Sequence, residues 1–343
     1  MRFKILLRKG DINDATHEYI SVIKDAVYKS YGIRDIPYIY SAKKMEKEDI
    51  LLIISPQVVL INWLLFRSKQ KIVYWFQGVA PEEVLFLYKG MYAKIKAILF
   101  TQVEKYILKK SRLIFFVSEK QLHHYQNKYG YKKDNYIIMP CFNKNMDESC
   151  FAASKYQRPT FVYAGSMLKW QCIEETLLLF SKIKERLPEA QLTILTADRN
   201  DAHKLLAKNH ISAEVKYVPV EDLSHEMTKY KYGFLLRDRI LINRVATPTK
   251  MNSYMAAGVI PIFSDVIGDF RKVFSTLKYA VACNYNQPEQ LIDRILEIER
   301  DTITPDRIIN EYRSFFDTYY NRNKYIDEIA ERLETLPRNR TSA

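Results

Sequence analysis

The chain has 343 residues, 48% of them hydrophobic, and a formal net charge of +13. This length predicts two domains, and the composition excludes general disorder. The chain has nine glycines and lacks both Gly-rich phosphate-binding motifs, which excludes the usual dinucleotide and P-loop sites. The positive charge predicts an anionic partner, namely nucleic acid, anionic lipid or a phosphorylated substrate.

The first half of the sequence alternates short apolar runs with amphipathic segments. This order predicts parallel strands joined by helices, with both faces of the sheet covered. Strands are expected at 2–7, 50–55, 72–76, 113–117 and 136–139, and helices at 15–31, 83–110 and 119–129.

The second half repeats the pattern after a polar seam at 143–158. The repeated pattern predicts two doubly wound domains. Their ligands would lie beyond the carboxyl ends of the strands. Strands are expected at 160–164, 191–195, 215–218, 232–236, 259–263 and 280–283, and helices at 172–186, 201–209, 222–230, 249–257, 289–300 and within 305–336.

Targeting and metal-binding signals are lacking in the sequence. The four cysteines form no Cys-x-x-Cys pair, so we expect reduced thiols and a cytoplasmic protein. The first residues have too short an apolar run for a signal peptide, and no stretch approaches about 18 uncharged apolar residues. The six histidines are scattered and no Asp-x-Asp occurs, so no metal site is expected.

The segment 232–258 contains the most informative candidate ligand-binding residues. An apolar strand ends at Arg237, and after a polar loop Thr247, Pro248, Thr249 and Lys250 open a helix, with Thr247 as the expected N-cap. A helix N-terminus favours phosphate, and Arg237 and Lys250 would add full positive charges beside it. The alternative, that both are solvated surface charges, is about equally supported by the sequence.

Two further strand ends carry polar residues. Gly165 and Ser166 follow the strand at 160–164, and Lys169 in the next turn would meet a phosphate as a point charge, unless it is an ordinary solvated lysine. In the first half, Gln77 and Gly78 follow the strand at 72–76, and Gln77 would bind a hydroxylated acceptor. Glu82 and Glu83 fit the first turn of a helix better than a catalytic role.

In order and spacing, these motifs resemble those of family 4 glycosyltransferases of the GT-B fold, above all the bacterial branch that builds capsular and surface polysaccharides. The strongest likeness is NRVATPTKMNSYMAAGVIPI, which is close to the family pattern Pro-x-Lys-x-x-Glu-Tyr-x-Ala-x-Gly before an apolar strand. The likeness recurs in FVYAGSMLKWQCIEE, YGFLLRD, WFQGVAPEE and IIMPCFN.

The resemblance implies an α/β fold with two Rossmann-like domains facing a central cleft. The acceptor-side domain would span 1–150, the nucleotide-sugar-binding domain 151–310, and a helical segment 311–343 would cross back to the first domain. The implied reaction moves a hexosyl group from a nucleotide sugar to a glycan or lipid-linked acceptor, with retention and without a metal or other cofactor. The implied setting is surface polysaccharide synthesis in the cytoplasm or on the inner face of the plasma membrane.

The resemblance also assigns roles to single residues. Arg237 and Lys169 would be the catalytic cations that neutralise the leaving diphosphate. Gln77 and Gly78 would lie on the acceptor side. The donor would be bound by Gly165, Ser166, Asn243, Thr249, Lys250 and Ser253.

The chain departs from the family at the usual ribose-binding carboxylates. Ser253 holds the slot of one Glu, and Val245 holds that of its partner eight positions earlier. Ribose binding would then be rebuilt with Asn243, Asn252 or Ser253, or activity would be weakened. A non-catalytic sugar-nucleotide-binding protein and a sugar-nucleotide epimerase of similar fold therefore remain alternatives. A nucleic-acid binder is disfavoured because the basic residues spread along the chain without a recognition motif.

The stretch 84–110 contains six lysines and one acid, Glu104. At helical spacing its apolar residues line one face, which predicts either reversible binding to an anionic membrane or ordinary packing on the sheet. The expected face consists of Leu87, Met91, Ile95, Ile98, Leu99 and Val103.

Overall fold

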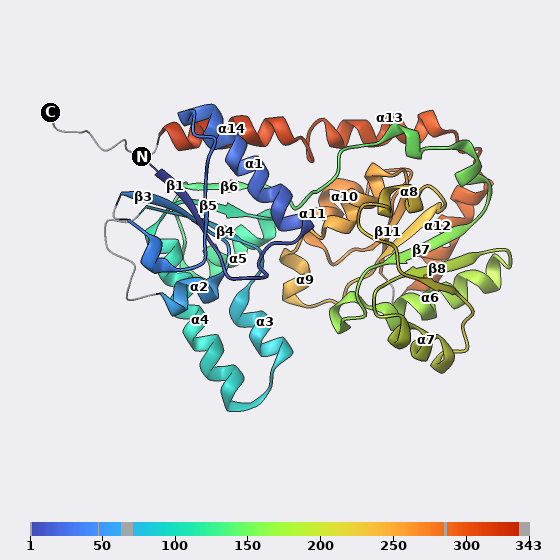
Figure 1. The fold of residues 1–343 in the computed structure, drawn as a ribbon. Coiled ribbons are helices and arrows are strands. Elements are labelled where there is room, and N and C mark those ends of the chain that lie inside the picture. Colours follow the sequence, from blue (N-terminus) through green and yellow to red (C-terminus); the bar gives the residue numbers. More distant parts are fainter. Residues whose placement is uncertain (1, 47, 63–70, 285–286, 336–343) are drawn as a thin grey trace. The chain divides into compact units, whose positions relative to one another are not determined.

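The computed structural model describes the chain except residues 1, 47, 63–70, 285–286 and 336–343, and except the side chains at 14, 15 and 169. The chain divides into two compact units (Figure 1). Unit 1 comprises 1–141 together with 321–343, and unit 2 comprises 142–320. The sequence-based boundaries were 150 and 310.

Unit 1 contains a six-stranded parallel sheet in the order β2-β1-β3-β4-β5-β6. The chain direction across the sheet reverses between β1 and β3, and helices cover the sheet (Figure 1). The strands are β1 (Arg2–Leu6), β2 (Tyr38–Ile39), β3 (Asp49–Ile53), β4 (Lys71–Phe76), β5 (Ser111–Phe116) and β6 (Tyr136–Ile138), and the helices are α1 (Asp14–Tyr31), α2 (Pro56–Ile61), α3 (Ala80–Leu87), α4 (Gly90–Lys110), α5 (Glu119–Tyr129) and α14 (Arg322–Glu334).

Unit 2 contains a second six-stranded parallel sheet in the order β12-β11-β10-β7-β8-β9. Its strand order reverses between β7 and β10, which are hydrogen-bonded neighbours at the centre of the sheet. The strands are β7 (Thr160–Ala164), β8 (Gln191–Leu195), β9 (Glu214–Lys216), β10 (Tyr232–Leu235), β11 (Ile260–Ser264) and β12 (Val281–Cys283), and the helices are α6 (Ile173–Arg186), α7 (Arg199–Lys208), α8 (Leu223–Met227), α9 (Leu241–Val245), α10 (Thr249–Ala256), α11 (Gly268–Phe274), α12 (Pro288–Arg300) and α13 (Pro305–Phe316).

The predicted fold class is confirmed, with two parallel sheets covered by helices. The expected strands all form, because continuous apolar runs are typical of parallel strands buried on both faces. The sequence analysis missed β2, α2, α9 and α11, each of which is shorter than eight residues. None of the described helices combines the length and apolar character needed to cross a bilayer.

The two long predicted helices are each interrupted. The segment 83–110 breaks where Tyr88 adopts an extended backbone and Gly90 takes a φ of 80°, a left-handed value that glycine tolerates best. The segment 305–336 breaks between α13 and α14, and the Asn321 side chain caps α14 by accepting from the Lys324 N–H.

Helix α14 returns the chain to unit 1, where it packs against α1. Arg322 forms ion pairs with Glu18 at 3.0 Å and Asp25 at 2.8 Å. The Ser30 hydroxyl donates to the Ala330 carbonyl at 3.0 Å. Unit 1 is therefore built from both ends of the chain, with unit 2 between them in sequence.

Candidate active site

The switch point of unit 2 gathers the residues that the sequence singled out. Gly165 directly follows β7, and Arg237 lies two residues beyond β10. Because β7 and β10 are parallel neighbours, both residues lie at the carboxyl edge of the sheet. In open α/β sheets, ligands bind at this edge where the strand order reverses.

Arg237 is a buried cation, with only 5% of its surface exposed. Its backbone N–H donates to Ser264 Oγ at 2.8 Å, and Nη1 donates to the Leu236 carbonyl at 2.9 Å. Among the described residues no carboxylate forms an ion pair with Arg237. Burial lowers its pKa, because removal from water disfavours the charged form.

Lys250, in the first turn of α10, is the second cation of this edge. Its Nζ donates to Gln171 Oε1 at 2.7 Å and lies 4.5 Å from the centre of the Tyr163 ring. A Cβ placed on Gly165 would lie 2.5 Å from this Nζ. Burial and the positive charge of Arg237 hold the pKa of Lys250 well below its ordinary value.

These two cations share a site that lacks compensating negative charge in the described part of unit 2. Burying an uncompensated charge costs several kcal/mol in general. Proteins keep such an arrangement where an anion binds, because the anion then supplies the missing charge. The site therefore fits a phosphate or diphosphate group.

Tyrosine side chains fix the two strand ends beside the cations. Tyr254 Oη accepts from the Ala164 N–H and donates to the Phe234 carbonyl, both at 3.2 Å, so it links the ends of β7 and β10. Tyr163 Oη donates to the Ser166 carbonyl at 2.6 Å, which fixes the loop after β7. The sequence analysis assigned no role to these tyrosines or to Gln171, although Tyr254 holds the tyrosine position of the family pattern.

The remaining donor-side candidates hold the surrounding loops. Asn243 is buried, and its Nδ2 donates to the Asp238 carbonyl at 3.0 Å. Thr249 is the first residue of α10, so the expectation of Thr247 as N-cap is wrong. Pro248 holds the N-cap position, because its ψ of 130° lies outside the helical region. The side chain of Lys169 lies outside the described residues.

Ser253 and Asn252 connect α10 to the start of unit 2. The Ser253 hydroxyl lies 3.1 Å from Asn143 Oδ1 and 3.2 Å from the Thr249 carbonyl oxygen. Asn252 Oδ1 accepts from the N–H groups of Asn143 and Lys144, at 2.9 and 2.8 Å. Both side chains are thus engaged with the protein itself.

In unit 1, the candidate acceptor-side residues lie at the carboxyl end of β4. Gln77 Nε2 donates to the Ile54 carbonyl at 3.2 Å. The Gly78 carbonyl accepts from Gln121 at 3.1 Å and from Tyr125 at 3.2 Å. A Cβ on Gly78 would lie 1.9 Å from Glu83 Oε1, so a larger residue here would require the Glu83 carboxylate to move.

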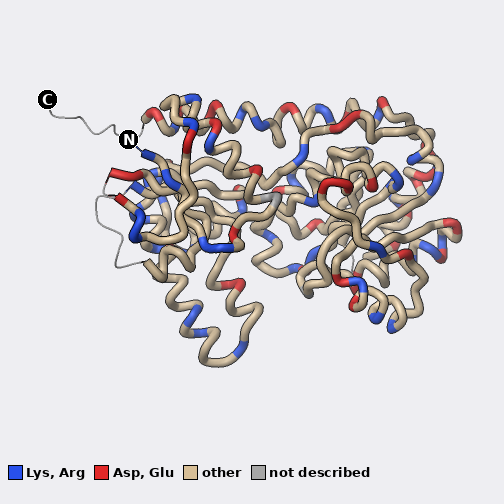
Figure 2. The backbone as a smooth tube through the Cα atoms, in the orientation of Figure 1, with Lys and Arg blue, Asp and Glu red and all other residues tan. Residues whose placement is uncertain are grey.

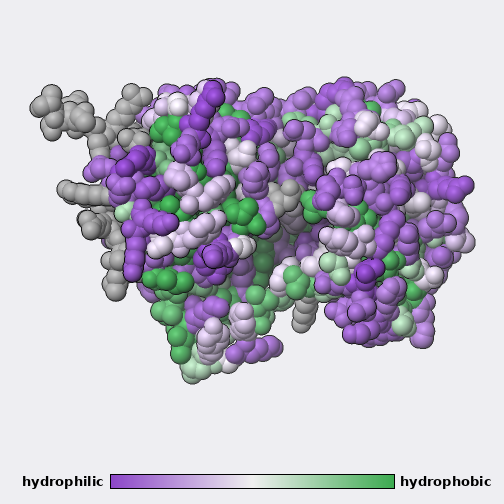
Figure 3. All heavy atoms as spheres, in the orientation of Figure 1, coloured by the Kyte–Doolittle hydropathy of each residue, from purple (hydrophilic) through white to green (hydrophobic). Residues whose placement is uncertain are grey.

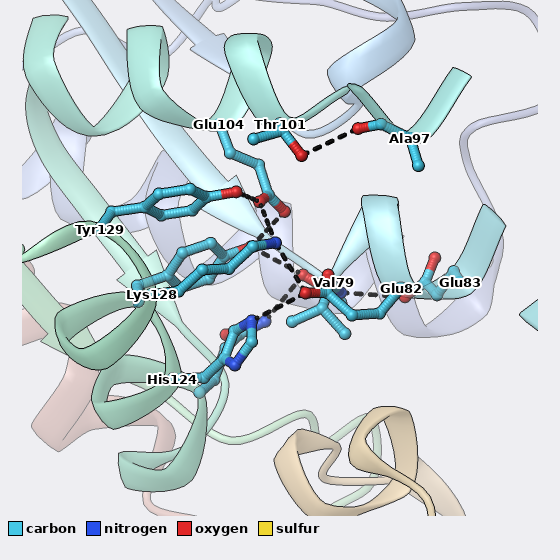
Figure 4. A network of polar contacts seen from close by, with 12 residues as sticks. Val79, Glu82, Glu83, Ala97, Thr101, Glu104, His124, Lys128 and Tyr129 are labelled. Atoms are coloured by element: carbon cyan, nitrogen blue, oxygen red, sulfur yellow. Dashed lines mark hydrogen bonds and ion pairs between the residues drawn. The ribbon is translucent and has the colours of Figure 1, made fainter. Parts of the chain in front are cut away.

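A carboxylate network lies behind this loop (Figure 4). Glu104 is 1% exposed and accepts from Tyr125 at 2.9 Å, Tyr129 at 2.5 Å and Lys128 at 3.3 Å. Lys128 also pairs with Glu82 at 2.6 Å. Burial raises the pKa of Glu104. The sequence analysis did not predict this network, because Glu104 lies in the middle of a helix, far along the chain from Gly78.

Glu82 and Glu83 occupy the first turn of α3, as predicted. Glu83 Oε1 accepts from the Val79 N–H at 3.0 Å, so it satisfies one of the free N–H groups at the helix start. Burial raises the pKa of Glu83. Burial opposes ionisation of Glu82 as well, but hydrogen bonds from His124 and Lys128 hold its pKa below the ordinary value.

The sequence matches one protein family, and the structure is similar to solved structures. Residues 151–315 match the family "Glycosyl transferases group 1". No curated protein matches the sequence significantly. S. aureus TarM has a similar structure, with a TM-score of 0.63 and 11% identity over 90% of this chain, and the match spans 58% of TarM.

Two other solved structures match over nearly their whole length. Anabaena HepE, solved in complex with UDP-glucose, gives a TM-score of 0.70 at 10% identity, covering 98% of this chain and 100% of HepE. WaaG, a glycosyltransferase involved in lipopolysaccharide biosynthesis, gives a TM-score of 0.64 at 13% identity, covering 95% of this chain and 99% of WaaG. Residues 151–315 therefore match the glycosyl transferases group 1 family, and the chain has the GT-B fold of the solved glycosyltransferases to which it is similar.

Proposed function

We propose that the protein transfers a sugar from a nucleotide-sugar donor, bound by unit 2, to a glycan or lipid-linked acceptor, bound by unit 1. The observation that carries the donor assignment is the pair of cations, buried Arg237 and partly buried Lys250, at the switch point between β7 and β10. A nucleoside diphosphate supplies the negative charge that this pair lacks. The complex of HepE with UDP-glucose supports the same class of donor.

In the proposed reaction, the bond from the anomeric carbon to the diphosphate breaks as the acceptor hydroxyl attacks. Negative charge develops on the leaving phosphate, and Arg237 and Lys250 stabilise it because they are already positioned and mostly shielded from water. Gly165 lets the backbone approach the diphosphate closely, and Ser166, Thr249 and Lys169 would complete the donor site.

We further propose that the reaction retains the anomeric configuration and needs no metal ion. Fixed cations on the leaving-group side do the charge-neutralising work that a divalent metal does elsewhere. The departing phosphate oxygen can accept the acceptor's proton on the same face of the sugar, so both bonds change on one side. Anomeric proton NMR of the product, and turnover in the presence of EDTA, test these two points.

The proposed pathway is surface polysaccharide synthesis at the cytoplasmic face of the plasma membrane. WaaG acts in lipopolysaccharide biosynthesis, and TarM has been solved with a GlcNAc-glycerol ligand and UDP, which favours envelope glycans as the product class. Gln77 and Gly78 would contact the acceptor from the carboxyl end of β4.

A non-catalytic sugar-nucleotide-binding protein is the second candidate. The observation that favours it lies at the two positions of the usual carboxylate pair: Ser253 is bonded to Asn143 and its own helix, and Val245 is 2% exposed. Such a protein, like an epimerase of the same fold, would bind the donor without transferring its sugar to an acceptor.

The decisive experiment is a panel of nucleotide sugars in a thermal-shift assay, followed by transfer assays with the donors that bind. We expect one nucleotide class to raise the melting temperature of the wild type, because a ligand that binds only the folded state stabilises it. The Arg237→Met variant should lose that shift. Binding without acceptor-dependent turnover would favour the second candidate, and a panel without any shift would refute the donor site.

A further inference from the structure

The end of α3 and the first turns of α4 carry a concentrated hydrophobic surface. Figure 3 shows hydrophobic atoms along the part of unit 1 that α4 forms. Of the sixteen large hydrophobic side chains that are exposed in the described structure, eight lie between residues 85 and 99. They are Leu85, Leu87, Tyr88, Met91, Tyr92, Ile95, Ile98 and Leu99, with exposed fractions from 44% to 69%.

This surface is not the face by which α4 packs. The packed face uses Ala93, Ala97 and Phe100, which form a cluster with Val84 of α3. At 100° per residue, Met91, Ile95 and Ile98 lie on the opposite side of the helix. The alternative that the predicted apolar face packs on the sheet is therefore wrong for five of its six residues, and only Val103 is buried.

The charges around this face are positive. Lys89, Lys94 and Lys105 are exposed, and the Lys96 Nζ lies 4.8 Å from the centre of the Tyr88 ring and 5.6 Å from that of Tyr92. The only carboxylate in 84–110 is Glu104, which is buried on the other side. Figure 2 shows basic but no acidic positions toward the free end of the α3–α4 hairpin.

We propose that this α3–α4 face docks unit 1 onto an anionic lipid bilayer, with Met91, Ile95 and Ile98 entering the acyl region. The lysines would then contact the head groups, and Tyr88 and Tyr92 would sit at the polar boundary, where amphipathic rings are favoured. A second copy of the chain is a poorer occupant, because its own lysines would meet like charges. The inference extends the proposed function, since unit 1 would meet a lipid-linked acceptor in the membrane.

The test is co-sedimentation of the full chain with vesicles. Binding is expected to vesicles of phosphatidylcholine and phosphatidylglycerol in equal parts, to weaken at high salt, and to be far weaker with phosphatidylcholine alone. Replacing Lys89, Lys94 and Lys96 with Glu should lower the partition coefficient by about a hundredfold or more. The double variant Ile95→Glu and Ile98→Glu should lower it at least about tenfold.

A matched control separates this face from general effects of adding charge. Leu178→Glu alters an equally exposed apolar residue, 52% exposed on α6 of unit 2, and should leave vesicle binding unchanged. An added tryptophan at Ile98→Trp should shift its emission to shorter wavelength with anionic vesicles. Equal binding by wild type and the Ile95/Ile98 variant would overturn the proposal, as would lipid-independent self-association that this variant abolishes.

Donor binding provides the independent readout. The Ile95/Ile98 variant should keep the donor-induced thermal shift of the wild type, because its substitutions lie in unit 1 on exposed positions. A wild type that binds vesicles but no nucleotide sugar would refute the proposed function alone. A wild type that binds nucleotide sugar but no vesicle would refute the docking face alone.

Discussion

Arg237 holds a full positive charge at 5% exposure, with its own neighbouring carbonyl as the partner of its guanidinium. Such a charge destabilises the ligand-free fold and becomes favourable when an anion arrives. We therefore expect Arg237→Met to raise the melting temperature while lowering turnover about tenfold or more, since a lost charged contact is worth roughly 1.5–3 kcal/mol.

Thermal unfolding and steady-state kinetics of the same preparation check this prediction. Arg237→Lys is the matched control, because it keeps the charge and loses the planar fork of donors. A variant that loses both stability and activity would instead mean that Arg237 is a structural residue whose charge the fold already compensates.

Lys250 gives the site a pH dependence. Burial and Arg237 lower its pKa in the free protein, whereas a bound diphosphate would raise it again. Binding should therefore take up protons, and affinity should fall as pH rises through the free protein's lowered pKa, because the neutral amine no longer attracts phosphate. Below that pKa, Lys250 is charged in both states and its contribution to affinity is constant.

Calorimetric titration with the nucleoside diphosphate, in buffers of different ionisation enthalpy, measures this proton uptake. Lys250→Met should weaken binding and remove the proton uptake, and Lys250→Arg should remove the uptake while keeping the charge. Identical proton uptake in Lys250→Met would assign the linkage to another group.

At the level of elements, the strands were predictable because each is an apolar run between turn signals. The predicted strand ends also placed Arg237 and Gly165 correctly at the edge of the sheet. The partners of these residues were not predictable. Tyr254 and Gln171 reach the site through the packing of α10 and of the turn before α6, which local patterns do not encode. Helix α4 shows the same limit. Its first half is apolar on both sides, and Ala93, Ala97 and Phe100 rather than Ile95 and Ile98 form the packed face there.

The turn after β7 is sensitive to a single added methyl group. In Gly165→Ala the new Cβ would lie 2.5 Å from Lys250 Nζ, and the φ of 150° disfavours any L side chain. We expect a stability loss of about 1–3 kcal/mol and a clear loss of donor affinity, because Lys250 must move.

Gly130→Ala is the control for backbone strain alone. Its φ is 65° at the end of α5, and a Cβ there would meet no atom within 4 Å. It should lose about 1 kcal/mol of stability and keep the donor affinity. Denaturant unfolding and nucleotide titration separate the two effects, and equal affinities of both variants would argue against the contact between Gly165 and Lys250.

At the level of the whole molecule, α14 is part of unit 1 although it follows unit 2 in the sequence. Deleting 321–343 would expose the side of α1 that α14 covers and remove the Arg322 pairs with Glu18 and Asp25. We expect unit 1 to unfold at a lower temperature, as a separate transition, while unit 2 keeps its melting temperature and its nucleotide binding.

Arg322→Met is the milder variant for this prediction, because it removes the ion pairs but keeps the helix. It should destabilise unit 1 by no more than about 1 kcal/mol, as is typical of partly exposed pairs. Calorimetry with and without nucleotide distinguishes the transitions, and a single, equally lowered transition for both units would contradict their independence.

The return of α14 also bears on the order of folding during synthesis. The Ser30 hydrogen bond to Ala330 joins residues 300 positions apart, and closing so long a disordered loop is slow and entropically costly. Unit 2, however, is one continuous segment, and rings at its two ends, Phe142 and Tyr320, lie 6.2 Å apart. Once unit 2 has folded, residues 141 and 321 are held together and the effective loop becomes short. Folded unit 2 thus brings together the two chain segments that build unit 1. A substitution that slows the folding of unit 2 should therefore delay the completion of unit 1 on the ribosome.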